Sequence, residues 1–83
     1  MQFVKGMVVR SKSGHDKGSF FVIAETENGY ALLTDGRSRP LASPKRKNLI
    51  HLAPTKTVVP PQRMTDSGIS LILAGFNSRV RTS

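Results

Sequence analysis

Cysteine is absent from the 83 residues of the chain. This absence excludes disulfide bonds, zinc sites built on thiolates and a cysteine nucleophile. A chain of this length buries only a small core, and without disulfides that core has to be stabilised by apolar packing. The sequence therefore predicts one small core, with little chain left over for a second.

Acidic residues are also few. Five Asp and Glu residues stand against thirteen Lys and Arg residues, which gives a net charge of +8 at pH 7. The excess is spread along the chain: residues 1–55 carry nine basic and four acidic side chains, and residues 56–83 carry four and one. Such an excess predicts a polyanionic partner, RNA or DNA first and an anionic membrane surface second.

Long apolar runs are missing too. No segment approaches the length of a membrane-spanning helix. Residues 1–6 lack the basic stretch followed by an apolar stretch that is typical of a secretory signal. We therefore expect a cytoplasmic protein. We also expect it to act as a monomer.

Short apolar runs separated by turn signals fill the first fifty or so residues. Five strands are expected, at residues 7–11, 19–26, 30–34, 37–41 and 48–52. Asn28-Gly29 and Asp35-Gly36 are typical of tight hairpin turns, because these residues tolerate positive φ. Pro40 restricts the fourth strand to an edge or cuts it short. This spacing predicts an all-β fold, either a small barrel or a sandwich.

The composition changes after residue 53. Prolines interrupt residues 54–65, which we interpret as an extended linker. Asp66 and Ser67 are candidates to cap a short helix that follows. One apolar face of this helix would carry Ile69, Ile72, Leu73 and Phe76. Either that face docks on the barrel or on another molecule, or the tail is weakly ordered, and weak order is our expectation. We therefore divide the chain into a barrel at residues 1–53 and a linker with a tail at residues 54–83.

A loop framed by two glycines separates the first two expected strands. Its sequence is Gly14-His15-Asp16-Lys17-Gly18. Glycine lets another backbone approach closely, so the amides of Gly14 and Gly18 are candidates to donate to phosphate oxygens. Arg10, Lys12 and Lys17 would add positive charge beside them. The loop therefore points to nucleic-acid binding.

Two further groups of cations extend this hypothesis. Arg37 and Arg39 lie two residues apart on an expected strand and would share a face. Lys45, Arg46 and Lys47 are consecutive in an expected loop before the last strand. The alternative for each cation is exposure to solvent with no partner. The hypothesis therefore depends on clustering of the cations.

The glycine loop lies within a longer pattern that resembles the KOW motif, Gly6-x-Val8-Val9-x-Ser11-x-x-Gly14-His15-Asp16-Lys17-Gly18 followed by an apolar strand and a hairpin. The pattern continues through Leu33-Thr34-Asp35-Gly36 and Pro44-Lys45-Arg46-Lys47-Asn48 to His51-Leu52. This continuation is similar to the small bacterial KOW-domain RNA-binding proteins related to large-subunit ribosomal protein fourteen of eukaryotes and archaea. The resemblance covers residues 5–53.

The resemblance implies an SH3-like five-stranded barrel that binds RNA, chiefly ribosomal RNA, without catalysis. It also implies that the loop at residues 14–18 contacts RNA. The protein would then act in translation as a component or accessory of the ribosome. Together with the clustered cations, the expected RNA-binding residues are Arg10, Lys12, Gly14, His15, Asp16, Lys17, Gly18, Arg37, Arg39, Lys45, Arg46 and Lys47.

The mode of recognition follows from the scarcity of aromatic residues, which are one tyrosine and four phenylalanines. Base-by-base reading of single-stranded RNA usually exposes aromatic side chains for stacking. Phe20 or Phe21 is expected in the core, whereas the hydroxyl of Tyr30 prefers a polar edge. We therefore expect a folded RNA surface to be read by its shape and by the positions of its phosphates.

An enzyme is the first alternative class. The only histidines are His15 and His51, with Asp16 beside the first. A catalytic pair needs hydrogen-bond reach and a pocket, and neither a Walker-type loop nor a nucleophile elbow is present. Only scattered carboxylates would complete a metal site at the histidines. We therefore expect no catalysis, metal or cofactor.

A protein-interaction module of the transcription or translation machinery is the second alternative, because SH3-like barrels also bind peptides. Basic residues outnumber the aromatic residues that a peptide groove would need, which favours RNA. DNA also fits the charge, but no helix has the spacing of a base-reading helix.

Overall fold

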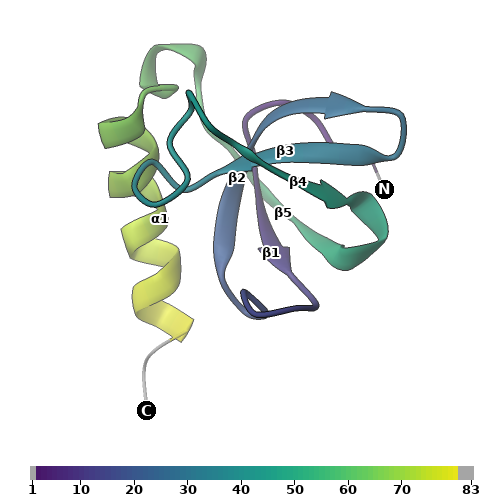
Figure 1. The fold of residues 1–83 in the computed structure, drawn as a ribbon. Coiled ribbons are helices and arrows are strands. Elements are labelled where there is room, and N and C mark those ends of the chain that lie inside the picture. Colours follow the sequence, from purple (N-terminus) through teal and green to yellow (C-terminus); the bar gives the residue numbers. More distant parts are fainter. Residues whose placement is uncertain (1, 81–83) are drawn as a thin grey trace.

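The computed structural model describes residues 2–80, with the side chains of residues 2–77. Five strands form one antiparallel sheet, and a helix crosses one of its faces (Figure 1). The sheet order is β4-β3-β2-β1-β5. The strands are β1 (Met7–Ser11), β2 (Phe20–Glu27), β3 (Tyr30–Thr34), β4 (Lys45–Asn48) and β5 (Leu52–Val58), and the helix is α1 (Asp66–Val80). The expected all-β fold is therefore confirmed in part: the structure is mostly β, with five antiparallel strands and a C-terminal helix.

The turn between β2 and β3 has the conformation that its sequence predicts. Asn28 has φ 25° and Gly29 has φ 86°, so both central residues have the positive φ of a tight hairpin turn. The register then places Glu27 opposite Tyr30 across the turn.

The second predicted hairpin, at Asp35-Gly36, is wrong. A carboxylate oxygen of Asp35 accepts hydrogen bonds from the backbone N–H groups of Arg37 and Arg39, each at 2.8 Å. A short acidic side chain that takes these donors offers the backbone an alternative to strand pairing. Residues 35–44 therefore form a loop, the strand predicted at 37–41 is absent from the described chain, and Arg37 and Arg39 do not share a strand face.

The last two strands lie elsewhere than predicted. Residues 45–48 pair with β3 as β4, so the three consecutive cations lie in a strand and not in a loop. Leu49–His51 is a 3₁₀ turn, in which the Asn48 side chain accepts from the N–H of Ile50. β5 then continues through residue 58, and Pro54 is tolerated because β5 is an edge strand. The linker predicted at 54–65 is therefore wrong for residues 54–58, and the expected boundary after residue 53 falls inside β5.

Apolar side chains fill both faces of the sheet. One cluster consists of Met7, Val9, Phe21, Ile23, Ala31, Leu33 and Leu52. The second consists of Val8, Val22, Val59, Ile69 and Leu73. Because neighbouring residues of a strand point to opposite faces, Val8 and Val9 enter different clusters. β1 is therefore buried on both sides, which requires the C-terminal residues to cover the second face.

The helix α1 supplies that cover, so the tail docks on the sheet and the expectation of weak order is wrong. All four residues of the predicted apolar face pack into the second cluster. Its first turn is capped by Thr65, whose Oγ1 accepts from the N–H of Gly68 at 3.0 Å. Asp66, a predicted cap, instead accepts a hydrogen bond from the N–H of Leu41 at 2.8 Å.

Candidate nucleic-acid interface

The glycine-framed loop between β1 and β2 is closed by its own backbone. Gly14 and Gly18 have φ values of 86° and 91°, a conformation that favours glycine. The N–H of Lys17 donates to the carbonyl of Gly14 at 3.1 Å, and the N–H of Gly18 donates to the carbonyl of Ser11 at 2.8 Å. The amide of Gly18 is therefore engaged inside the loop, which corrects its predicted role as a donor to phosphate.

Asp16 lies at the centre of this loop and faces β4. Its carboxylate accepts from the ammonium groups of Lys45 at 2.5 Å and Lys47 at 3.0 Å, and from the hydroxyl of Ser11 at 2.8 Å. The side chains of Asp16 and Lys47 are 14% and 11% exposed. Lys47 also donates to the carbonyl of Ser13 at 2.9 Å. We call Asp16, Lys45 and Lys47 the Asp16 clamp, because they join the loop to β4.

The clamp is electrostatic. Burial raises the pKa of Asp16, but hydrogen bonds from Lys45, Ser11 and Lys47 lower it by more, so the net pKa is well below its ordinary value. The carboxylate is therefore charged throughout the physiological range. Two of the three consecutive cations that the sequence placed at the RNA surface are thus paired with an acid inside the molecule.

Arg46 points to the other side of β4 from Lys45 and Lys47. Its guanidinium carbon lies 4.1 Å from the centroid of the Tyr30 ring, and its Nε lies 3.7 Å from a carboxylate oxygen of Glu27. Alternation along a strand separates Arg46 from its two neighbours. Residues 45–47 therefore do not form one cationic cluster.

The loop at residues 35–44 carries exposed arginines and rests on α1. Gly36 is so close to the helix that an added Cβ would lie 2.9 Å from the backbone nitrogen of Ser70. The Nε of Arg37 donates to the hydroxyl of Ser70 at 3.1 Å. Burial raises the pKa of Asp35, but hydrogen bonds, chiefly from the backbone of Arg39 and Arg37, lower it by more. The net pKa of Asp35 is therefore below its ordinary value. The loop is therefore held on an ionised carboxylate and on the helix.

An open cleft of about 420 Å³ lies between the two loops. Four of its lining residues belong to the predicted site: His15, Asp16, Arg39 and Lys45. The other six lining residues were not among the predicted site residues; they are Ser19, Phe20, Phe21, Asp35, Ser38 and Asn77. Asn77 directly follows the apolar face of α1, so the periodicity of that helix was the one signal that pointed toward it. The cleft therefore brings together residues of both loops, β4 and the helix.

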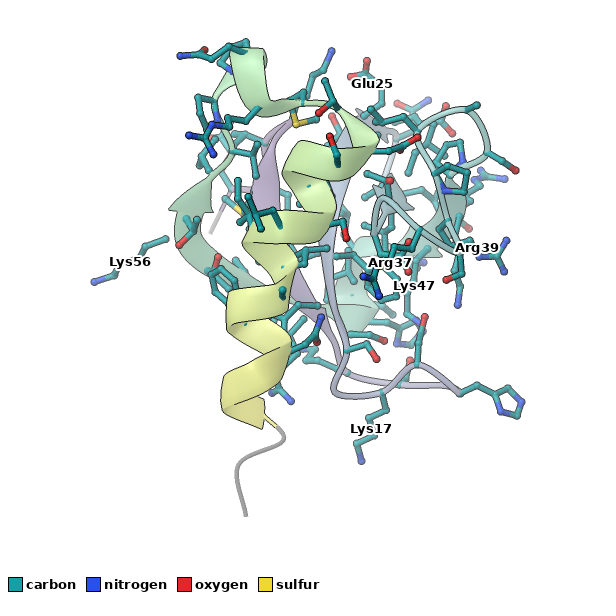
Figure 2. The ribbon with its side chains drawn as sticks, turned by 90° about the vertical axis from the view of Figure 1, so that its left-hand side faces the viewer. Lys17, Glu25, Arg37, Arg39, Lys47 and Lys56 are labelled. Carbon is teal, nitrogen blue, oxygen red and sulfur yellow. The ribbon has the colours of Figure 1, made fainter. Side chains whose placement is uncertain are left out.

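The other predicted residues lie outside this cleft. Arg10 is exposed on the face of β1 that also carries Val8, whereas the N–H of Lys12 donates to the carbonyl of His51 near the start of β5. Lys17 projects from the tip of its loop, and Arg39 and Lys56 project on opposite sides of the molecule (Figure 2). Positive charge thus occurs on more than one side, with a concentration around the two loops.

No protein-family model matches the chain, and no curated protein matches it. Across residues 2–80, no helix is long and apolar enough to cross a membrane. In the same part of the chain, no three His, Asp or Glu side chains come together as a metal site would require.

Proposed function

We propose that the protein binds RNA without catalysing a reaction, through the surface around the two loops. The observation that carries this proposal is the cleft, where His15, Arg39 and Lys45 meet from three separate segments. Lys17 extends the positive surface at the tip of the glycine-framed loop (Figure 2). The net charge of +8 favours a polyanion over a neutral partner.

The exposed cations make the phosphate contacts in this proposal. Arg39 offers a guanidinium that can bind one phosphate through two hydrogen bonds. Lys17 contributes a separate point charge at the glycine-framed loop (Figure 2). Lys45 and Lys47 keep the glycine-framed loop in place through Asp16, so they act mainly as positioning residues. Affinity then depends on release of counterions from the RNA and falls as salt rises.

We further propose that the five strands form an SH3-like barrel of the KOW type. β4 and β5 lie at opposite edges of the sheet, yet only residues 49–51 separate them in the chain. A connection this short brings the two edges close together at one end, because a residue spans at most about 3.6 Å. The sheet therefore has to curl, as it does in a small barrel.

The proposed RNA is ribosomal, and the proposed role is that of a ribosomal or ribosome-associated component of translation in the cytoplasm. Support comes from the resemblance to KOW-domain RNA-binding proteins across residues 5–53. The glycine-framed loop that carries this resemblance borders the cleft through His15 and Asp16.

Matched charge reversals test the proposed surface. Lys17→Glu and Arg39→Glu change residues at the two loops, whereas Lys56→Glu makes the same change in charge on an exposed residue of β5. We expect the first two variants to weaken binding to ribosomal RNA about tenfold or more at moderate salt. They should also reduce the salt dependence of binding, because the log of the binding constant falls with the log of salt concentration by about 0.7 to 0.9 per phosphate neutralised. Equal effects of all three variants would rule out this surface.

A protein-interaction module is the second candidate function, and one observation favours it. A separate cleft of about 420 Å³ is lined by Lys5, Gly6, Val58, Val59, Pro61 and Met64, and half of the Val58 surface is exposed. Apolar concave surfaces of this kind bind protein side chains. Crosslinking in cells, followed by identification of the attached molecules, separates the candidates: mostly ribosomal RNA supports the first, and mostly protein supports the second.

A further inference from the structure

The cleft between the two loops combines an apolar wall with a cationic opening. We infer that it holds a single unpaired nucleotide of the bound RNA, with the base against Phe20 and a phosphate at Arg39. This inference rests on the proposed RNA-binding function and adds a specific feature that the RNA has to contain. It differs from recognition by shape alone, because a fully paired RNA helix has no base to offer the cleft.

The size of the cleft suits one nucleotide. Its volume of about 420 Å³ lies toward the lower end of the range for small-molecule sites, roughly 300–1,000 Å³. A base within a helix is stacked on both sides and paired at its edge, so it cannot enter a cleft in a protein surface. Proteins that read RNA by its bases accordingly contact loops, bulges and ends, where bases are unstacked.

The apolar wall of the cleft is Phe20. One part of its ring packs against Phe76, with the ring centroids 5.1 Å apart and the planes at 41°. Phe20 is nevertheless only partly buried, and its remaining surface lines the cleft. Phe21 contributes little, because it is 5% exposed and belongs to the other apolar cluster. A partly buried aromatic ring fixed by a second ring is suited to stacking on a base.

The cationic opening is preorganised. The N–H of Arg39 donates to Asp35 at 2.8 Å, and its carbonyl accepts from the hydroxyl of Thr34 at 2.6 Å, so its backbone is fixed on both sides. Lys45 is fixed by Asp16. Both carboxylates that line the cleft are therefore engaged in internal hydrogen bonds, which leaves the guanidinium of Arg39 to meet a phosphate.

The helix contributes a polar group that can read the base. The side-chain Oδ1 of Asn77 accepts from the N–H of Phe20 at 3.4 Å, and Asn77 lines the cleft. With its oxygen turned to the backbone, the group that Asn77 offers a ligand is its NH₂, a donor to a carbonyl oxygen or ring nitrogen of a base. The C-terminal helix, which the resemblance does not cover, thus takes part in the site.

Two RNA hairpins with the same stem and loop test the inference, one fully paired along the stem and one with a single bulged 2-aminopurine nucleotide. We expect the protein to bind the bulged hairpin about tenfold more tightly and to quench the fluorescence of the 2-aminopurine as it stacks on Phe20. Asn77→Ala and Phe20→Leu should each remove most of this preference and leave affinity for the paired hairpin unchanged. Leu71→Ala, on the exposed side of α1, is the control and should keep the preference.

The outcomes separate this inference from the proposed function. If both hairpins bind equally and binding is salt-dependent and weakened by Lys17→Glu, RNA binding stands and the nucleotide site is overturned. If neither hairpin nor ribosomal RNA binds, the proposed function itself fails. A bulge preference that survives both Asn77→Ala and Phe20→Leu would also overturn the inference, since the base would then be held elsewhere. Displacement of the bulged hairpin by micromolar free nucleoside monophosphate would reassign the cleft to a small ligand.

Discussion

Two basic segments, residues 37–39 and residues 45–47, look alike in the sequence but differ in the structure. Arg37 and Arg39 are exposed on a loop held by Asp35, whereas Lys45 and Lys47 are paired with Asp16, a residue 29 and 31 positions away in the chain. The first segment is available to a partner, and the second stabilises the glycine-framed loop. A run of cations therefore predicts an interaction surface only after its internal partners are known.

The largest expected effect comes from removing the acid of the clamp. Asp16→Asn leaves Lys47, whose side chain is 11% exposed, without its charge partner. We expect the free energy of unfolding at pH 7 to fall by about 3 kcal/mol, because removing one partner of a buried ion pair leaves a charge in a poorly solvated site. Urea denaturation measures the change. Lys17→Ala, on the same loop but exposed, should change stability by less than about 0.5 kcal/mol.

The effect of Asp16 should also depend on pH in a defined direction. Its pKa is lowered in the folded state, so its contribution to stability is complete above the unfolded value, about 4, and is lost as the pH falls through the folded pKa. The difference in stability between the wild type and Asp16→Asn should be constant from pH 5 to 8 and shrink below pH 4. Asp35 has the same sign but is present in both proteins, so it cancels. A difference that grew in acid would contradict this assignment.

Changes in the exposed segment, residues 37–39, should lower RNA affinity and leave stability nearly unchanged. We expect Arg39→Ala to lower the affinity for ribosomal RNA about tenfold or more, because a hydrogen bond to a charged group contributes roughly 1.5–3 kcal/mol. Its stability should stay within about 0.5 kcal/mol of the wild type, since the contacts that fix Arg39 come from its backbone. Filter binding and urea denaturation on one protein preparation measure both quantities. A large loss of stability with unchanged affinity would reverse the roles of the two segments.

The smallest expected effect comes from replacing Arg46, whose contacts differ from those of its neighbours Lys45 and Lys47. Arg46→Ala removes a cation–π contact with Tyr30 and an exposed ion pair with Glu27. We expect a loss of about 0.5–1 kcal/mol in the free energy of unfolding. Its effect on RNA affinity should match that of Lys56→Ala, a cation on the opposite side from Arg39. An RNA effect as large as that of Arg39→Ala would place Arg46 in the interface.

Local signals in the sequence predicted the local features of the structure. The Asn28-Gly29 turn and the apolar face of α1 are confirmed, because each depends on a residue's own backbone preference or on a short repeat. The wrong predictions involve either a side chain that competes for backbone hydrogen bonds or a pairing between residues that are far apart in the chain. Asp35 accepts a hydrogen bond from a backbone N–H of the segment that was expected to be a strand. β5 includes Pro54 because it pairs with the otherwise unpaired edge of β1.

The candidate site was harder to predict than the strands. Residues 14–18, 37–39 and 45–47 were each identified as basic or glycine-rich, but the Asp16 clamp joins side chains about thirty positions apart. No local pattern indicates such a pairing. Asn77 joins the cleft only because α1 docks on the sheet, which depends on the fit of Ile69 and Leu73 to a face formed by residues far away in the chain.

Lysine acetylation with and without ribosomal RNA, mapped by mass spectrometry, tests the difference between the two segments most directly. In the free protein we expect Lys17 and Lys56 to react quickly and Lys47 slowly, because its ammonium is held by Asp16 and by the carbonyl of Ser13. Addition of RNA should protect Lys17 and leave Lys56 reactive. Acetylation of Lys47 as fast as that of Lys56 in the free protein, or a Lys17 that stayed reactive when RNA was bound, would contradict this difference between the segments.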